Sequence, residues 1–498
     1  MAIVATMRSP QGFPARPRPA AAASQPTSGH PLARSRARLR SLVLLGALVL
    51  ATAVPASATV VVNVDPSGHP LPRLFSSGMV LQRDTAVPVW GRGAPGEQVT
   101  VSIADQSKQA TTGPDGTWRV ELDPMIAGGP YLMRISGSNT IGLSDVLVGD
   151  VWICAGQSNM VIHRAPKQEV EADPDLHVLG FSGRWYDRPS AVAYGFAREL
   201  RDRVGVPIGI INRAAGGTTI RNWLPHQVHD DPDHDVQAVV GSWSNEGEQY
   251  YPQVSSFEGF AIKGVVYWQG EQDLKLARQD PGSVDNYRVL LPALVRAWRS
   301  AWQRPDLPFV FVQLPTGGGL QVDQAVAPLP PSPPVPDIAA KMRAAGFNGL
   351  EEPHTGLTIS VDIDGGTHPK NRDQYATRIA EVALGTTYDA GPGYSGPIYS
   401  SMELEAGGRV RLHFRPGTAD GLHAVGGPLQ GFAISANGRD FAWADAAIDG
   451  SDVVVWNDAV TDPTVVRYAW DRWPTWANLF NDSDLGAAPF STATTPAP

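Results

Sequence analysis

The chain has 498 residues, of which 42% are hydrophobic and 18% charged, a balance typical of soluble globular proteins with two or three domains. Its formal net charge is −9, and 33 basic groups face 49 acidic ones once the Arg-rich residues 1–58 are set aside. An acidic chain disfavours nucleic acid and anionic membranes as partners, and a single cysteine, Cys154, excludes an internal disulfide framework and a cysteine-based zinc cluster.

The first 58 residues have the pattern of a leader. Basic residues between Arg34 and Arg40 precede an apolar run, Leu42–Val54, and the small residues Ala56-Ser57-Ala58 follow it. This order predicts a secretory signal peptide that is cleaved near Ala58, after a disordered, Pro- and Ala-rich start. The run is short for a membrane span, so we expect a secreted or periplasmic protein, with an uncleaved anchor as the alternative.

Residues 59–148 alternate short β-type runs with turn signals. Val87–Gly91 and Gln98–Ile103 are two such runs, and Gly113-Pro114-Asp115-Gly116 is a turn before another. Short strands at this spacing predict an N-terminal antiparallel, sandwich-like β region. We expect it to support the rest of the chain rather than to carry chemistry.

The stretch from Gly149 to Met160 combines a buried strand with an abrupt turn. An apolar run ends in Gly156-Gln157-Ser158-Asn159. A strand that ends in such a turn is where an α/β enzyme presents a nucleophile, and Gly156 permits the backbone conformation required. Ser158 is therefore a candidate nucleophile whose own N–H would face a developing oxyanion. An ordinary loop is the other interpretation of Gly-x-Ser alone.

The longer string resembles the first block of the sialate O-acetylesterases, a branch of the SGNH hydrolases. Phe75–Gln82 and Ala127–Tyr131 are also similar to this family's N-terminal region. The resemblance implies an α/β fold, with a parallel sheet flanked by helices between N-terminal and C-terminal antiparallel β regions. We assign Gln157 and Asn159, on either side of the serine, to substrate binding.

Helix and strand patterns alternate between residues 149 and 395, which favours a parallel sheet and defines the expected catalytic domain. Ala191–Val204 has helical spacing, and Ile208–Ile211 is an apolar strand followed by Gly216-Gly217. Paired glycines at a strand end let backbone approach a ligand closely. This is the second block of the resembled family, which implies that Gly217 contributes an oxyanion N–H.

The third block follows the strand Phe260–Trp268. Gln269 stands where other SGNH enzymes carry an Asn, so its amide is predicted to be a further oxyanion donor. Glu271 is assigned to substrate binding, with an orienting or acidic triad role and a plain solvated carboxylate as alternatives. Further along, the sequence predicts helices at Tyr287–Trp302 and Asp337–Ala345, a strand at Phe309–Leu314 and an exposed Pro-rich loop at 317–336.

The candidate base is His368, which follows the predicted strand Leu357–Ile363. The carboxyl ends of parallel strands share one edge of a sheet, so His368 is expected to meet Ser158 and Gly217 there. Many SGNH enzymes place an Asp three residues before this His, but that position is Gly365. Asp362 or Asp364 is expected to orient the imidazole, or else a backbone carbonyl does so in a Ser–His dyad. A metal site made of these groups is a minor alternative.

Residues 396–498 return to short β-type runs such as Val410–Phe414 and Val453–Trp456, which predict a C-terminal antiparallel β region. Segments around Val466–Trp470 and Ala477–Asn481 are similar to the end of the resembled family. Trp470, Trp473 and Trp476 either line a sugar-binding rim or pack inside this region, and packing is the commoner fate of such residues.

The prediction is a secreted serine esterase that removes O-acetyl groups from sugars through an acetyl-serine intermediate, without metal or cofactor. The resemblance implies O-acetylated sialic acids as substrates, with Arg221 proposed as the partner of the sialate carboxylate. An esterase for acetylated xylan or other hemicellulose is the alternative with the same chemistry. A secreted carbohydrate-binding protein with an inactive esterase site is the alternative from another class.

Overall fold

The computed structural model describes residues 71–162, 173–241, 243, 246–315, 325–335, 337–363, 365–388 and 395–493. The expected leader and Asp364 lie outside the described residues. All described residues belong to one compact unit, Ala58–Pro498. None of the helices in these ranges is both long enough and apolar enough to cross a membrane.

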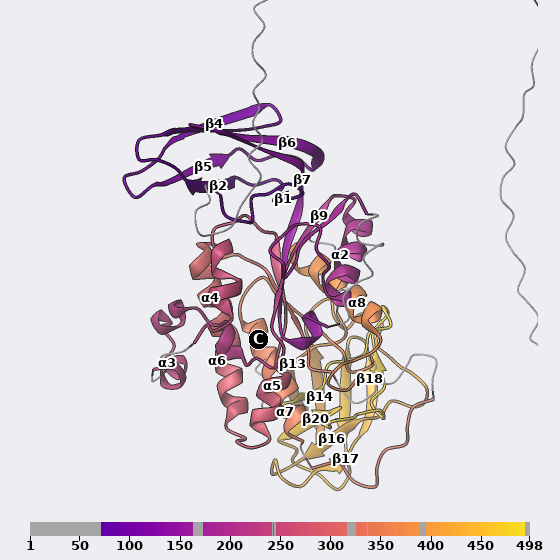
Figure 1. Cartoon of the computed structure of the whole chain (residues 1–498). Coiled ribbons are helices and arrows are strands. Elements are labelled where there is room, and N and C mark those ends of the chain that lie inside the picture. Colours follow the sequence, from indigo (N-terminus) through magenta and orange to yellow (C-terminus); the bar gives the residue numbers. More distant parts are fainter. Residues whose placement is uncertain are drawn as a thin grey trace, which may run out of the picture. The chain divides into compact units, whose positions relative to one another are not determined.

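A parallel sheet forms the centre of the fold (Figure 1). Among the described residues its strands lie in the spatial order β8–β9–β7–β10–β11–β12. Their bounds are β7 (Thr140–Gly156), β8 (Leu176–Leu179), β9 (Ile208–Ala214), β10 (Gly264–Trp268), β11 (Phe309–Val312) and β12 (Thr355–Thr358). After β7 the chain builds β8 and β9 on one side, and then β10 on the other. The carboxyl end of β7 is therefore a topological switch point, where open α/β sheets bind ligands.

Helices cover both faces of this sheet. The helices with their bounds are α2 (Ala191–Val204), α3 (His234–Val240), α4 (Tyr250–Gln253), α5 (Glu271–Ala277), α6 (Ser283–Trp302), α7 (Ile338–Ala345) and α8 (Arg372–Thr387). Successive residues of a strand point to opposite faces. Trp152 and Cys154 of β7 accordingly pack in one cluster with α2 and α8, and Ile153 packs in another with α6. Figure 1 shows α2 and α8 on one side of β7 and α6 on the other. The predicted α/β class is confirmed.

The helix ends follow ordinary capping rules. The side chain of Ser190 accepts a hydrogen bond from the Ala193 N–H at the start of α2, and Gly205 ends that helix in the left-handed conformation. Asp337 caps α7 in the same way. The predicted strand at Leu357–Ile363 is displaced, because β12 ends at Thr358 and the chain turns over Ser360–Ile363.

One long strand joins the N-terminal β region to the parallel sheet. β7 runs through the expected boundary at residue 148, and its first half pairs antiparallel with β6 and parallel with β1. Its second half lies between β9 and β10. The other N-terminal strands are β1 (Val80–Gln82), β2 (Val87–Arg92), β3 (Gln98–Ile103), β4 (Gln106–Thr111), β5 (Thr117–Leu122) and β6 (Gly128–Ser136).

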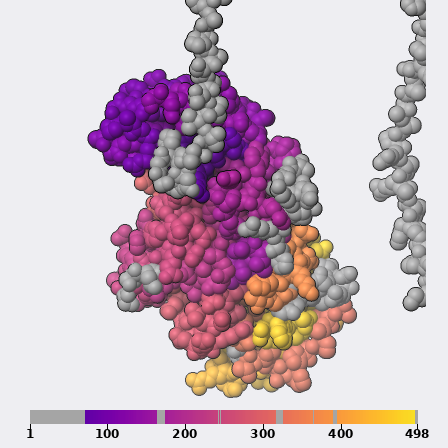
Figure 2. All heavy atoms as spheres, viewed as in Figure 1, coloured from indigo at the N-terminus to yellow at the C-terminus, as the bar shows by residue number. Residues whose placement is uncertain are grey.

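The C-terminal region is antiparallel throughout its described strands. Two four-stranded sheets have the orders β13–β14–β19–β18 and β17–β16–β20–β22, and β15 pairs with β21. The bounds are β13 (Tyr399–Glu405), β14 (Arg409–Phe414), β15 (His423–Ala424), β16 (Phe432–Ser435), β17 (Ala442–Trp443), β18 (Asp445–Asp449), β19 (Asp452–Trp456), β20 (Val465–Tyr468), β21 (Leu479–Phe480) and β22 (Phe490–Ser491). This region packs against the segment before it, as the yellow and orange surfaces in Figure 2 show. One hydrogen bond between the region and the helices runs from Arg343 of α7 to the carbonyl oxygen of Asp471.

Candidate active site

The turn after β7 requires a glycine and places a serine. Gly156 has a φ of +127°, and a Cβ added there would lie 2.0 Å from the carbonyl oxygen of Trp268. The next N–H, from Gln157, donates to that carbonyl at 2.9 Å. Ser158 then begins a short 3-10 helix, η1 (Ser158–Met160), and is half-buried. The close approach of β10 therefore brings Ser158 to the edge of the sheet.

A buried amide on the neighbouring strand holds this turn in place. Asn212 of β9 donates hydrogen bonds from Nδ2 to the carbonyl oxygens of Cys154 and Met160, at 3.1 and 3.2 Å. Its Oδ1 accepts from the N–H of Ser190, the residue that caps α2. Because Asn212 is fully buried, both ends of the turn are tied to the core rather than to solvent.

The candidate base meets the candidate nucleophile. Nε2 of His368 lies 3.0 Å from Oγ of Ser158, although the two residues are 210 positions apart. His368 is exposed, on the loop between β12 and α8. A hydroxyl and an imidazole at this separation are within the distance required for proton transfer from nucleophile to base.

One of the two carboxylates predicted to orient His368 has a different partner. Asp362 is buried, and both of its carboxylate oxygens accept hydrogen bonds from the guanidinium of Arg378 on α8. Among the described residues, no carboxylate lies within hydrogen-bonding distance of Nδ1 of His368. Asp362 therefore anchors the loop on α8, and Asp364 and a backbone carbonyl stay as the expected orienting groups.

Asn159 has a different place from the one expected of a substrate ligand. It is fully buried, and its Nδ2 donates to Oε1 of Glu271 at 2.6 Å and to the carbonyl oxygen of Thr367 at 3.1 Å. Thr367 directly precedes His368. The assignment of Asn159 to substrate contact is thus corrected: its amide joins the loops that carry Ser158 and His368, because η1 turns it inward.

Glu271, at the start of α5, lies at the edge of the cavity beside Ser158. Its Oε1 accepts hydrogen bonds from Asn159 and from the indole N–H of Trp268 at 3.0 Å, and its buried Oε2 has no partner among the described residues. Burial raises the pKa of this carboxyl to about 7. Asp273, two residues further along, has its pKa raised to about 7 by the same cause.

Of the expected oxyanion donors, Gly217 lies at the cavity and Gln269 does not. Gly217 follows β9 with a φ of +73° and is exposed. The Gln269 amide is buried instead, where Nε2 donates to the carbonyl oxygen of Thr218 at 3.0 Å and to Asp273. The amide that lies at the cavity belongs to Gln157, whose Oε1 accepts from Nε2 of Gln269 and from the N–H of Gln272, both at 3.4 Å.

The cavity beside Ser158 has a volume of about 380 Å³, which is in the range of small-molecule sites. Four cationic side chains line it: Lys275, Arg278, Arg343 and Arg472. Arg221, the cation predicted from the sequence, is not among the lining residues, and its guanidinium lies 4.4 Å from the ring centre of Trp243. Arg221 therefore stacks on an aromatic ring outside the cavity.

Sequence reasoning missed these four cations because they come from α5, α7 and the C-terminal region. Arg343 is buried in α7, and desolvation lowers its pKa to about 10. Arg472 stacks on Trp473, which is 53% exposed and also lines the cavity. Trp470 and Trp476 are buried. The Trp-rich tail thus supplies one ring to the cavity and two to the core, a division that the tail's sequence does not indicate.

Comparisons with known proteins show which family the chain resembles. Residues 148–328 match the model of a family described as carbohydrate esterase, sialic acid-specific acetylesterase. The sialate O-acetylesterases of Pongo abelii and Homo sapiens are each 26% identical, over 80% and 67% of this chain and 87% and 74% of their own. A carbohydrate acetylesterase from Xanthomonas citri is 32% identical in sequence, and its crystal structure superposes with a TM-score of 0.71 over 85% of this chain and 99% of that one.

The matched segment contains the turn with Ser158, the Gly217 loop and the strand end before Glu271. These are three of the blocks on which the resemblance in the sequence rests, and His368 lies beyond the matched segment. The chain belongs to the sialic acid-specific acetylesterase family of carbohydrate esterases.

Proposed function

We propose that this protein is a serine esterase that removes acetyl groups from O-acetylated sialic acids. The observation that carries the proposal is the 3.0 Å contact between Nε2 of His368 and Oγ of Ser158 at the edge of a cavity with four cationic side chains. Family membership supports ester hydrolysis on a carbohydrate. The charge of the cavity supports an acidic sugar.

In the first half-reaction His368 accepts the hydroxyl proton while Oγ of Ser158 attacks the acetyl carbonyl carbon. The resulting oxyanion receives hydrogen bonds from the N–H groups of Ser158 and Gly217. We assign the third donor to the amide of Gln157, because its Oε1 already accepts hydrogen bonds and its NH₂ group has no partner among the described residues. His368 then protonates the departing sugar oxygen, and the acetyl group stays on Ser158.

In the second half-reaction a water molecule gives a proton to His368 and attacks the acetyl-serine. Collapse of this second tetrahedral intermediate breaks the bond to Oγ, which regains its proton from His368, and acetate leaves. Every proton and charge is carried by side chains and N–H groups of this chain, so we propose a reaction that is independent of metal. His368 must be neutral to act as the base, so activity falls at acid pH.

The cations favour sialate over the neutral sugars of xylan. A sialic acid carries a carboxylate, and an arginine binds a carboxylate through two parallel hydrogen bonds. Arg278 and Arg472 line the cavity and are exposed, so they can reach a bound sugar, whereas Arg343 is buried. We assign the carboxylate to Arg278 and Arg472, and the exposed Trp473 ring to the apolar face of the sugar.

Acetate release from a panel of acetylated glycans tests the function. Wild-type protein should release acetate from O-acetylated sialic acid, and Ser158→Ala should not. If the protein prefers acetylated xylan, its substrate is a neutral hemicellulose rather than a sialic acid, and the ester hydrolysis is the same. Equal, background-level release by wild type and Ser158→Ala, on the glycans and on 4-nitrophenyl acetate, would make the protein a carbohydrate-binding protein without esterase activity.

We also propose that the protein is exported, because residues 34–58 have the order of charges, apolar run and small residues of a signal peptide. N-terminal sequencing of the mature protein tests this. A chain that begins close to Thr59 and is recovered outside the cytoplasm supports export. A cytoplasmic protein that keeps Leu42–Val54 contradicts it.

A further inference from the structure

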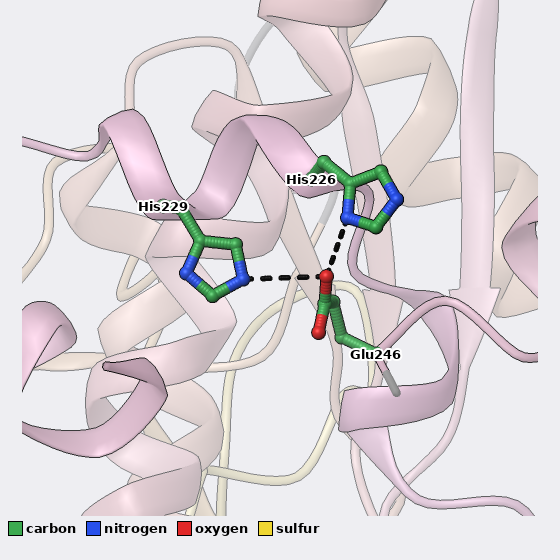
Figure 3. Close-up of side chains that lie close together, drawn as sticks. All are labelled: His226, His229 and Glu246. Carbon is green, nitrogen blue, oxygen red and sulfur yellow. Dashed lines mark hydrogen bonds and ion pairs between the residues drawn. The ribbon is translucent and has the colours of Figure 1, made fainter. Parts of the chain in front are cut away.

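A second group of titratable side chains lies outside the catalytic cavity. Nδ1 of His226 lies 2.5 Å from Oε1 of Glu246, and Nε2 of His229 lies 3.2 Å from the same oxygen (Figure 3). One ligand atom from each residue lies within 4.8 Å of the other two. We propose that His226, His229 and Glu246 bind a divalent transition metal ion, with Zn²⁺ as the best match. None of the three lines the cavity beside Ser158.

The local backbone explains why the two imidazoles meet. His226 and His229 both belong to η3 (His226–Asp230), a 3-10 helix. With three residues per turn, side chains three positions apart lie above one another, so both rings project from the same side of the helix (Figure 3). Two histidines at this spacing can therefore bind the same ion.

The carboxylate is held in place by a different segment. Gly247 donates an N–H to the carbonyl oxygen of Arg221 at 3.0 Å, and Gln249 donates to that of Asn222 at 2.9 Å. These bonds fasten the segment with Glu246 to η2 (Ile220–Trp223), just before the histidines. Two backbone elements thus present the three ligands before any ion arrives, which lowers the entropic cost of binding.

The burial of Glu246 is an independent observation that points to a ligand. Its side chain is 2% exposed, and Oε2 is buried without a hydrogen-bond partner among the described residues. A buried carboxylate oxygen without a partner loses its hydration and gains nothing in return. A metal ion that this carboxylate binds through both of its oxygens, together with the two imidazoles, gives Oε2 a partner as well as Oε1.

The ligand set selects the class of metal. Two imidazole nitrogens and one carboxylate oxygen are typical ligands of Zn²⁺, whereas Ca²⁺ and Mg²⁺ prefer sites made of oxygen. The side chain of His226 is 69% exposed, so water has access to a fourth coordination position and the ring has room to move back from Glu246. Bound metal would connect η3 to the segment before α4, and we assign it a structural role.

Metal binding to the metal-stripped, full-length mature protein tests the proposal. Zn²⁺ titrated calorimetrically should bind one ion per chain with a Kd of about 1 μM or tighter and raise Tm by several degrees. Co²⁺ in the same site should give the strong visible absorption of a tetrahedral ion. The double variant His226→Ala/His229→Ala and the single variant Glu246→Gln should each lose the stoichiometric site.

His413→Ala is the matched control. Nδ1 of His413 lies 3.0 Å from a carboxylate oxygen of Asp452, but Arg411 already neutralises that carboxylate. This variant should therefore keep the Zn²⁺ site.

Two results would overturn the metal site. One is that wild type binds no stoichiometric Zn²⁺ even at a Zn²⁺ concentration 100-fold above the expected Kd of about 1 μM. The other is that both site variants bind Zn²⁺ as wild type does. In that case the group is a His–carboxylate cluster and nothing more. Esterase activity does not decide the question, because the double variant should hydrolyse 4-nitrophenyl acetate like wild type once metal-free circular dichroism shows that it is folded.

Discussion

Two histidine-containing sites in this molecule differ in how they are assembled and in what their imidazoles contact. At the cavity beside Ser158, His368 meets a hydroxyl that comes from a strand end 210 residues earlier. At the second site, His226 and His229 meet a buried carboxylate no more than 20 residues away. A hydroxyl beside an imidazole can lose its proton and attack, whereas a buried carboxylate beside two imidazoles is a fixed charge suited to a cation. The partner atom, rather than the histidine, decides which chemistry is available.

The largest effect should come from the pair at the cavity. Ser158→Ala and His368→Ala should each lower kcat for ester hydrolysis by about 10³-fold or more, and the double variant should be little worse than either single one. Groups that act together in one proton transfer show such non-additive losses. Steady-state kinetics of the four proteins with 4-nitrophenyl acetate measure this. Independent, multiplying losses would break the link between the two residues.

The next effect should come from the amide that joins the two catalytic loops. Asn159→Ala removes the hydrogen bonds to Glu271 and to the carbonyl before His368, so kcat should fall about 10- to 100-fold with little change in KM. Asn437→Ala is the control, since it removes side-chain bonds in a turn of the C-terminal region. An equal loss of kcat in both variants would show only general destabilisation.

The cationic lining should affect binding rather than chemistry. Arg278→Ala and Arg472→Ala should each raise KM for O-acetylated sialic acid about 10-fold, and leave KM for acetylated xylan unchanged, because only sialate offers a carboxylate. Arg221→Ala, outside the cavity, should affect neither substrate. Equal changes on both substrates would remove the proposed role of the cavity charges.

The smallest effect concerns stability and pH. Burial raises the pKa of Glu271 to about 7, well above its value in the unfolded chain, so the folded state keeps this proton in a range where the unfolded chain loses it. Its contribution is therefore complete at pH 4 and is lost as pH rises to about 7, by as much as about 3 kcal/mol. Glu271→Gln should flatten the dependence of the unfolding free energy between pH 5 and 8, which urea denaturation at each pH measures. An unchanged slope would contradict the assignment.

The agreement between expectation and structure is closest where a pattern is local. The helix predicted at Ala191–Val204 is α2 with the same bounds, because its cap, its apolar spacing and its terminal glycine are all within the segment. Gly156 similarly marks the turn before Ser158, since no other residue fits against the carbonyl oxygen of Trp268. The last strand differs, because the pattern of Ser360–Ile363 predicts a continued strand, whereas β12 ends at Thr358 and this segment turns toward Arg378.

Side-chain direction at the strand ends was not predictable. Gln157 and Gln269 both follow apolar strands, and each is an amide suited to an oxyanion. Only packing separates them, since Gln269 is drawn to Thr218 and Asp273 while Gln157 lies at the cavity. Arg221 and Arg278 are a similar pair, because each is an arginine close to one of the family's sequence blocks. Arg221 packs on the ring of Trp243 outside the cavity, whereas Arg278 lines the cavity.

By itself the sequence determined the α/β class, the family and the two segments that carry Ser158 and His368, because periodicity, glycine turns and short motifs are properties of neighbouring residues. The tertiary structure alone decided that Asn159 joins two loops, that cations from α5, α7 and the C-terminal region line one cavity, and that Glu246 lies beneath two histidines. Those outcomes depend on which segments, far apart in the sequence, pack against one another in the folded chain. A side chain's partner is then the one that satisfies its charge or hydrogen bond in that buried setting.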